Sequence, residues 1–251
     1  MSAAGGAAAE LTRLDGEVAI VTGAARGVGL AVADVLARQG AAVCAADVLD
    51  LGDAKRAIEA RGSRALTVPT DVSQPDQVSR LVERTVAELG GVDVLVCCGA
   101  VYGGGDFDEV DIEEWRRVLD VNLFGTFLCL RAVFPAMRRR GGGKILTFGS
   151  TAGKDGGHSS GPQYAASKGG VHAMSKWAAA NGAPEIRVNV LIPGLVDTEM
   201  VSGQGYPQDI SPMRRRAQPE EIAEVAAFVV SDAASYMNGA SVDVNGGYMR
   251  T

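Results

Sequence analysis

The sequence predicts a single α/β domain in which seven parallel strands form a doubly wound sheet with helices on both faces. Two observations favour this class. The chain of 251 residues is long enough for one large domain with a sizeable core. Short apolar runs alternate with longer stretches whose apolar residues recur at helical spacing. Such alternation is typical of parallel strands joined by right-handed crossovers, because each connecting helix packs back onto the sheet.

Seven apolar runs of strand length follow one another along the chain. Between them the stretches AVADVLARQG and QVSRLVERTVAELG are the clearest helices, and each ends at a glycine suited to a helix C-cap. No long linker or internal repeat is visible, so we expect one domain over residues 14–251 behind a flexible low-complexity tail at 1–13. The expected strands are 18–22, 42–47, 64–70, 92–97, 144–148, 187–192 and 241–244.

Composition and charge exclude several classes of protein. Apolar residues make up 47% of the chain and charged residues 22%, as in ordinary globular proteins. The net charge of −6 provides no field for nucleic acid or an anionic membrane, and no run approaches the roughly 18 apolar residues of a membrane span. Four irregularly spaced cysteines and two histidines indicate no metal site. No secretory signal is visible, so we expect a cytoplasmic protein with reduced thiols.

A glycine-rich turn, VTGAARGVG at residues 21–29, follows the first expected strand and opens a helix. Such a turn presents free N–H groups and the positive end of the helix dipole, and glycine lets a pyrophosphate approach the backbone closely. The spacing is GxxxGxG rather than the common GxGxxG. The prediction of a dinucleotide site therefore depends mainly on the position of the turn between a strand and a helix. We expect a dinucleotide to contact Gly23, Arg26, Gly27, Val28 and Gly29.

Acidic residues at the ends of the next two strands indicate how the adenosine is bound. Asp47 lies 18 positions beyond Gly29, where a carboxylate accepts hydrogen bonds from the ribose hydroxyls and repels a 2′-phosphate. This favours NAD over NADP, although Arg26 suits a 2′-phosphate. The alternative is that Asp47 only begins a turn. Asp71, followed by Val72, is placed to hold the adenine edge, and the alternative is an N-cap or turn residue.

The pentapeptide YAASK places Tyr164 and Lys168 on one face of a helix. A phenol loses its proton near pH 10, but a nearby ammonium lowers that pKa and makes the phenol a usable acid–base group. Taken alone, such a pair is common on protein surfaces. Ser150 follows the fifth strand, where doubly wound sheets bind ligands, and its hydroxyl is placed to bond a substrate oxygen. The alternative for Ser150 is a plain turn.

In order and spacing these motifs resemble the short-chain dehydrogenase/reductase family, which has a Rossmann-type fold. The resemblance covers roughly residues 14–248 and includes VNLFGT around Asn122 and PGLVDT at 193–198. It implies that Tyr164 is the general acid–base, that Lys168 lowers its pKa and holds the nicotinamide ribose, and that Ser150 orients the substrate oxygen. It further implies cofactor contacts by Asp71, Val72, Gly99, Tyr164, Lys168, Pro193, Gly194, Val196 and Thr198.

The resemblance also implies a role for Asn122 and an assembly. Asn122 is expected to fix a water that relays protons to Lys168, and the alternative is a helix-interior Asn satisfied by backbone groups. The family implies a homotetramer built largely through the helices that carry Asn122 and Tyr164.

Two departures from the family pattern concern the site. The usual Asn-Asn-Ala-Gly after the fourth strand is Cys97-Cys98-Gly99-Ala100 here, and cysteine cannot replace the amide hydrogen bonds. Ser150 precedes Tyr164 by 14 residues, one more than the family usually has, so Thr151 is the alternative orienting hydroxyl. The S-x-x-G pattern favours Ser150.

These features predict an oxidoreductase that passes hydride between NAD(H) and a secondary alcohol or ketone of small size. The alternative is an NADPH-dependent 3-oxoacyl-carrier reductase, which Arg26 and the basic runs at 138–140 and 214–216 favour, because acyl carrier proteins are acidic. A remote alternative is a non-catalytic dinucleotide sensor. The loops 101–109, 154–163 and 199–213 are expected to frame the substrate, with a short lid at 199–218. His158, Gln163 and Tyr206 are candidate contacts.

Overall fold

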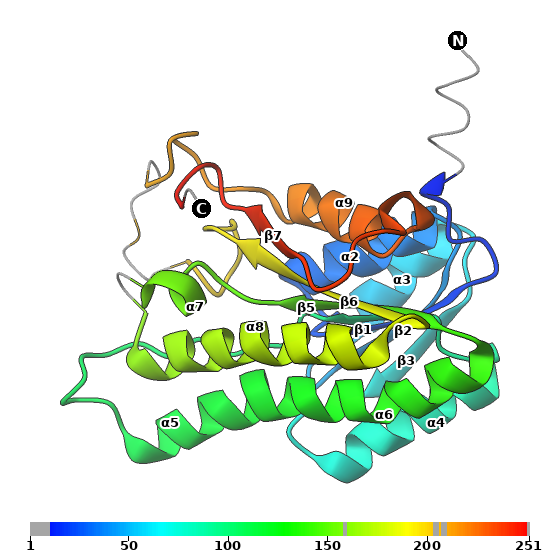
Figure 1. Ribbon diagram of the computed structural model, residues 1–251, viewed down its shortest axis with the longest axis horizontal. Helices are drawn as coiled ribbons and strands as arrows, with labels where there is room; N and C mark the ends of the chain where they lie inside the picture. Colours follow the sequence, from blue (N-terminus) through cyan, green and yellow to red (C-terminus); the bar gives the residue numbers. More distant parts are fainter. Residues whose placement is uncertain (1–10, 158–159, 203–205, 207–209, 250–251) are drawn as a thin grey trace.

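A parallel seven-stranded sheet forms the centre of the computed structural model, which describes residues 11–157, 160–202, 206 and 210–249 (Figure 1). The strand order is β3-β2-β1-β4-β5-β6-β7, and every neighbouring pair is parallel. The predicted fold class is therefore confirmed, and the strand bounds differ from the expected ones by two residues at most. The strands are β1 Val18–Thr22, β2 Ala42–Asp47, β3 Ala65–Pro69, β4 Val94–Cys97, β5 Gly143–Phe148, β6 Ile186–Pro193 and β7 Ser241–Val244.

Helices cover both faces of the sheet. Helices α2, α3 and α9 pack on one face, and α4, α6 and α8 pack on the other (Figure 1). A short helix, α7, follows β5. The helices are α2 Gly27–Arg38, α3 Gly52–Ala60, α4 Pro75–Leu89, α5 Ile112–Leu119, the π-helical turn η1 Asp120–Phe124, α6 Gly125–Arg140, α7 Ala152–Asp155, α8 Pro162–Gly182, α9 Pro219–Val229 and the 3-10 turn η2 Asp232–Ala234.

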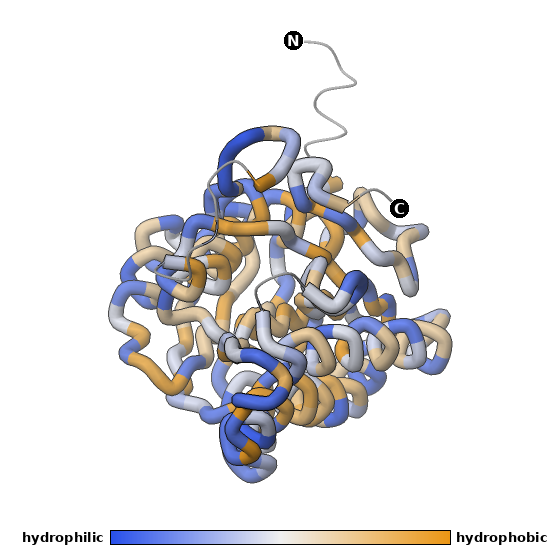
Figure 2. The backbone as a smooth tube through the Cα atoms, turned by 90° about the vertical axis from the view of Figure 1, so that its left-hand side faces the viewer, coloured by the Kyte–Doolittle hydropathy of each residue, from blue (hydrophilic) through white to orange (hydrophobic). Residues whose placement is uncertain are grey.

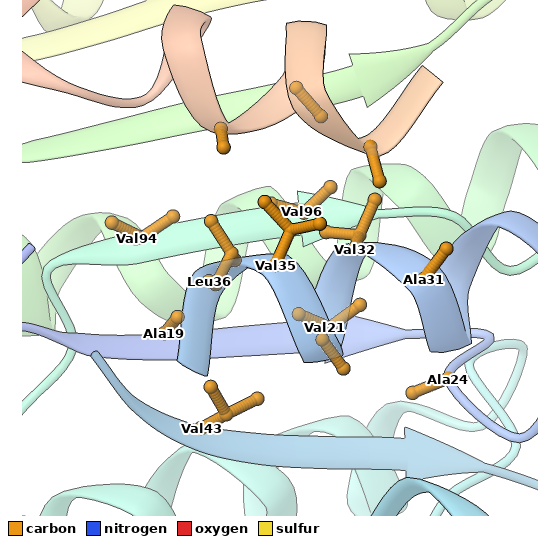
Figure 3. Packing of buried hydrophobic residues seen from close by; sticks show 14 of the residues in the cluster. Ala19, Val21, Ala24, Ala31, Val32, Val35, Leu36, Val43, Val94 and Val96 are labelled. Carbon is orange, nitrogen blue, oxygen red and sulfur yellow. The ribbon is translucent and has the colours of Figure 1, made fainter. Parts of the chain in front are cut away.

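The strands are apolar throughout because both of their faces are buried. In β1, Ala19 and Val21 point to the side of α2, where they meet Val32 and Leu36 (Figure 3). The alternate residues Val18 and Ile20 belong to the cluster on the opposite face. Many hydrophilic residues lie along the outer loops, while hydrophobic segments run through the interior (Figure 2).

A continuous helix formed by α5, η1 and α6 spans Ile112–Arg140. Among the described residues it alone is long and apolar enough to cross a membrane by length and composition. Charged residues such as Asp120 and Arg131 interrupt the apolar letters, which is why no apolar run of that length stands out in the sequence. It is a core helix, because the cluster beneath the sheet contains its residues Leu128, Cys129, Leu130, Val133, Ala136 and Met137.

The strand order reverses between β1 and β4, and this reversal places the site. Strands β2 and β3 continue to one side and β5, β6 and β7 to the other, so a crevice opens where the chain leaves β1 and β4. Packing begins at Leu14, which is buried and whose N–H donates to Gln39 O at 2.8 Å. Most of the expected tail, residues 1–10, lies outside the described residues.

Candidate active site

A cavity of about 1000 Å³ lies at the carboxyl ends of the strands, where the order reverses. Ser150 lines it, and Asn122 is absent from its lining. Every residue expected to bind the cofactor also lines this cavity, namely Gly23, Arg26, Gly27, Val28, Gly29, Asp47, Asp71, Val72, Gly99, Tyr164, Lys168, Pro193, Gly194, Val196 and Thr198. Residues from seven separate segments therefore meet around one space of dinucleotide size.

The glycine turn forms one wall of the cavity through backbone alone. Gly23 has a φ of +68°, and a Cβ on it would lie 2.6 Å from Gly99 Cα. A Cβ on Gly29 would overlap the carbonyl oxygen of Gly23. The turn therefore needs glycine at both positions: Gly23 for its positive φ and Gly29 for its close packing. It leaves bare backbone at the start of α2, which fits a pyrophosphate.

Two carboxylates line the end of the cavity beyond β2 and β3. Asp47 Oδ2 accepts a hydrogen bond from Ala25 N at 3.1 Å, and its Oδ1 accepts one from Leu49 N at 3.0 Å. These amides fix the carboxylate while leaving it partly exposed. Asp71 Oδ1 accepts from the amide and hydroxyl of Ser73, so Asp71 lines the cavity and also caps a turn. Such an end suits a ribose diol and an adenine amino group.

Arg26 pairs with Glu199 across the mouth of the cavity. Both side chains are exposed, and Glu199 follows Thr198 at the start of the expected lid. The methyl of Thr198 would lie 3.4 Å from a Cβ on Gly27, so the segment carrying Glu199 runs over the glycine turn. Glu199 could not be singled out from the sequence, because nothing there indicates a partner 173 residues away.

The loop after β4 shows how the chain compensates for the missing asparagines. Thr22 is the last residue of β1. Its carbonyl oxygen accepts a hydrogen bond from Cys98 N at 3.2 Å, and its hydroxyl oxygen accepts one from Gly99 N at 3.3 Å. Asn122 Oδ1 accepts a hydrogen bond from Val101 N at 2.8 Å, and Asn122 Nδ2 donates one to Val101 O at 3.0 Å. The backbone is thus held from outside the loop. Burial raises the pKa of the Cys98 thiol, which favours inert packing over redox chemistry.

Asn122 lies in the π-helical turn η1 and is buried. Besides bonding Val101 O, its Nδ2 donates to Ser167 Oγ at 3.1 Å. Both amide hydrogens are therefore used within the chain, as in the alternative of an asparagine satisfied largely by backbone groups. The water relay through Asn122 stays a prediction. Asn122 positions the loop after β4 and helix α8.

Helix α8, which carries Tyr164 and Lys168, is held against the end of β5. Lys168 Nζ donates to Phe148 O, the last carbonyl of β5, at 2.9 Å. A Cβ on Gly153 would lie 2.6 Å from the carbonyl carbon of Lys168, so the S-x-x-G pattern lets α7 pack on α8. Tyr164 is the third residue of α8, whose first residue is proline, as is common at helix starts. Tyr164 and Lys168 therefore face the cavity together.

Burial sets the pKa values of the two catalytic candidates. It raises the pKa of Tyr164 to about 12, and the Ser150 hydroxyl, which bonds the phenol, acts in the opposite direction. Burial also lowers the pKa of Lys168 to about 8. Lys168 Nζ bonds Phe148 O and lies 5.8 Å from the centroid of the Tyr164 ring, and its effect on the pKa of Tyr164 stays a prediction. In this structure Ser150 is the group that favours the phenolate.

A second cavity of about 220 Å³ lies on the other side of Ser150 and Tyr164, which line both. Thr151 lines only the smaller cavity, so the structure favours Ser150 as the hydroxyl at the junction. Tyr102, which the sequence analysis missed, packs against Tyr164 with ring centroids 5.5 Å apart. Its hydroxyl lies 3.2 Å from that of Tyr206. An aromatic residue in the loop expected to frame the substrate was the available signal.

The other two expected substrate contacts have different outcomes. Gln163 is fully buried and donates to Gly104 O at 2.9 Å, so it supports the loop at 101–109 rather than facing either cavity. His158 lies outside the described residues.

The expected lid is anchored at both ends. Val196 and Ala217 form a parallel bridge, and Asp197 N donates to Ala217 O at 2.8 Å. The basic run within it is largely used inside the chain: Arg215 bonds Glu221 at 2.6 and 2.7 Å, and Arg216 lies 3.6 Å from Asp197.

The other basic run is similarly engaged. Arg138 lies over the Phe134 ring and donates to Asn181 O, while Arg140 pairs with Asp93. Over the described part of the chain, no cluster of His, Cys, Asp and Glu has the arrangement of a metal site.

Comparison with known proteins agrees with this geometry. Residues 23–249 match the family model described as Enoyl-(Acyl carrier protein) reductase. The chain is 42% identical to a cis-4-hydroxycyclohexanecarboxylate dehydrogenase of Sinomonas cyclohexanicum, over 92% of this chain and 96% of that protein. It is 37% identical to a 3-alpha-(or 20-beta)-hydroxysteroid dehydrogenase of Mycobacterium bovis, over 94% and 90%. A crystal structure of a short-chain type dehydrogenase/reductase from Mycobacterium marinum matches with a TM-score of 0.94 and 34% identity, covering 97% of this chain and all of that one.

Proposed function

This chain belongs to the short-chain dehydrogenase/reductase family, and from that premise we propose that it is an NAD(H)-dependent dehydrogenase that interconverts a secondary alcohol and its ketone. Membership makes it an oxidoreductase acting on CH–OH groups with a nicotinamide dinucleotide. The observation that carries the proposal is the position of Ser150 and Tyr164 between the two cavities. A substrate in the smaller cavity presents its oxygen to both hydroxyls while its carbon faces the larger one.

The chemistry divides between the cofactor and the side chains. When bound, the dinucleotide accepts a hydride during alcohol oxidation and donates one during ketone reduction. Ser150 donates a hydrogen bond to the substrate oxygen, and Tyr164 takes the proton of the alcohol or returns it to the ketone. Lys168 holds its ammonium beside the ring. Because the pKa of Tyr164 is raised to about 12, the phenolate fraction grows as the pH rises from about 7 to about 10, so oxidation is expected to quicken. Reduction uses the protonated phenol, which stays the dominant form over this range, so its rate is expected to change little.

Asp47 supports the preference for NAD. Its carboxylate lines the cavity and is fixed by the amides of Ala25 and Leu49. In this position it can accept hydrogen bonds from the two ribose hydroxyls. A 2′-phosphate there would face the Asp47 carboxylate with a second negative charge and would have no hydroxyl to donate to it. The same pocket has Asp71 on its wall, which adds to the repulsion.

The smaller cavity supports a substrate of one-ring size. Its volume of about 220 Å³ lies below the range of roughly 300–1,000 Å³ that is typical of drug-sized ligands. Of the two relatives, one is named for a substrate with a single ring and the other for a steroid. We therefore propose a secondary alcohol on a single saturated ring.

The proposal is tested by following the absorbance of the reduced nicotinamide. Purified protein is assayed with NAD and with NADP against cis- and trans-4-hydroxycyclohexanecarboxylate, cyclohexanol, a 3α-hydroxysteroid and a 3-hydroxyacyl thioester. We expect NAD-linked oxidation of a one-ring alcohol to be fastest. Turnover only with NADPH and a 3-oxoacyl thioester would contradict the proposal.

Tyr164→Phe identifies the acid–base group in the same assay. This variant keeps the ring and loses the proton-carrying oxygen, so kcat should fall by roughly 10²–10⁴-fold. Its circular dichroism spectrum should match that of the wild type, which separates a catalytic loss from misfolding. Unchanged turnover would remove Tyr164 from the mechanism.

A second candidate function is NADPH-dependent reduction of the 3-oxo group of an acyl chain carried by an acyl carrier protein. The description of the matching family model names such a carrier, which favours this alternative. The internal contacts of Arg138, Arg140, Arg215 and Arg216 weaken it, because four of the six arginines in the two basic runs are already engaged. Loss of 3-oxoacyl-carrier reduction on mutation of the exposed pair Arg139 and Arg214 would support this alternative.

A further inference from the structure

The ion pair between Arg26 and Glu199 occupies a decisive place at the adenosine end of the cavity. Arg26 follows Ala25, whose amide bonds the carboxylate of Asp47. The guanidinium therefore extends from the same stretch of backbone that fixes the ribose-binding acid. Arg26 is also the single basic residue in the glycine turn, VTGAARGVG. It is the natural partner for a phosphate at the ribose 2′ position.

Glu199 occupies the guanidinium of Arg26, which is then not free to bind a phosphate. Its carboxylate lies on the guanidinium of Arg26, and both side chains line the cavity. The side chains are 60% and 73% exposed, so the pair faces solvent and the incoming dinucleotide. A 2′-phosphate would have to displace Glu199 from Arg26, in a cavity that the carboxylate of Asp47 also lines. A free 2′-hydroxyl requires no such displacement.

The other cations of the cavity do not replace Arg26. Arg116 is paired with Glu113 on α5, and Lys168 bonds Phe148 O beside Tyr164. Arg117 also lines the cavity from α5, an element separate from the glycine turn.

We propose that Glu199 is a specificity-determining residue, which selects a dinucleotide with a free 2′-hydroxyl by holding Arg26 in an ion pair. This inference rests on the proposed function, because it explains the preference for NAD that the proposed function includes. It assigns the preference to two carboxylates from distant parts of the chain. Asp47 accepts the ribose hydroxyls, and Glu199 withholds the cation that a phosphate requires.

Direct binding measurements test this inference without any alcohol substrate. Isothermal titration calorimetry gives the Kd values of the full-length wild type and Glu199→Gln for NAD and for NADP. Freeing Arg26 for a charge-assisted hydrogen bond should lower the Kd for NADP by about tenfold relative to that for NAD. The matched control is Glu224→Gln, which breaks an exposed pair with Arg38 outside both cavities and makes the same change in charge. It should leave the ratio of the two Kd values within about twofold.

A double-mutant cycle shows whether Glu199 acts through Arg26. In the background of Arg26→Met, adding Glu199→Gln should change the ratio by less than about twofold, because no cation remains to be freed. If Glu199→Gln changed the ratio of the two Kd values equally in both backgrounds, the inference would be overturned, because Glu199 would then repel the phosphate directly. An unchanged ratio in Glu199→Gln alone would also overturn it. A wild type that prefers NADP would instead contradict the proposed function, while the change between variants still decides the role of Glu199.

Discussion

At the scale of single residues, the site places a lysine where its charge is unfavourable. Lys168 is 4% exposed, and burial lowers its pKa to about 8. One carbonyl, that of Phe148, is the hydrogen-bond partner of its ammonium. In the unfolded chain the group titrates near 10.5, so between the two values the unfolded state binds more protons than the folded state. The free energy of unfolding therefore rises with pH across this window and is lowest below pH 8.

Replacing this lysine is expected to change how stability depends on pH. Relative to Lys168→Met, the wild type should gain about 2 kcal/mol between pH 7 and pH 9.5, because the cost of burying the charge disappears as the folded-state lysine deprotonates. Urea unfolding at both pH values measures the difference. Loss of the bond to Phe148 O adds an offset that does not vary with pH. The control is Lys176→Met on the exposed side of the same helix, which should show no such trend. A constant difference for Lys168→Met would contradict the buried charge.

At the scale of elements, the glycine turn and the loop after β4 form one packed unit. Gly23 contacts Gly99 backbone to backbone, and Thr22 bonds both Cys98 and Gly99. No side chain can enter between the two segments. A change in either segment is therefore expected to disturb the cofactor cavity as a whole.

Gly23→Ala tests this contact, and the chain offers a matched control. Gly62 has a similar φ of +75° with nothing within 4 Å of an added Cβ, so Gly62→Ala measures the conformational strain alone. That strain is about 1–2 kcal/mol. Gly23→Ala should cost about 2 kcal/mol more because its methyl meets Gly99, and it should also weaken NAD binding. Denaturant unfolding and calorimetry measure the two effects. Equal losses of stability in both variants would contradict the close contact.

The elements could be predicted from the sequence better than the contacts between them. Alternation of apolar runs predicted all seven strands, because a strand buried on both faces is apolar throughout. The order of strands also explains why the expected cofactor residues meet at one edge. The pairing of Glu199 with Arg26 and of Asn122 with Val101 could not be predicted, since each joins distant segments through side-chain geometry. The burial of Tyr164 and the bond from Lys168 to Phe148 O could not be predicted either, because both are tertiary effects.

At the scale of the whole molecule, apolar side chains are exposed on the helices that the family resemblance connects with assembly. Phe124 and Phe127, at the junction of η1 and α6, stack with ring centroids 6.1 Å apart and are about two-fifths exposed. Trp177 on α8 is 69% exposed. Rings of this size are favourable to bury against another subunit.

We therefore expect a homotetramer, four times 25.9 kDa, in light scattering coupled to size-exclusion chromatography. Changing Phe124 and Phe127 together to Asp should reduce the measured mass, because two charges would be buried at the interface. The control is Phe107→Asp, at an 86% exposed position in the loop after β4. A wild-type monomer, or a doubly substituted variant of unchanged mass, would contradict this assignment.

The anchoring of residues 196 and 217 has a consequence for how this protein changes over evolutionary time. Val196 and Ala217 are joined by a bridge, so the stretch between them is an insert whose two ends are held together. Doubling the length of such an insert costs only about 0.6 kcal/mol in loop-closure entropy. New side chains can thus be tried over the substrate cavity while Ser150, Tyr164 and Lys168 stay in place. The same redox machinery can then be inherited by enzymes for different alcohols, and exchanging this insert between relatives is a direct route to altered substrate range.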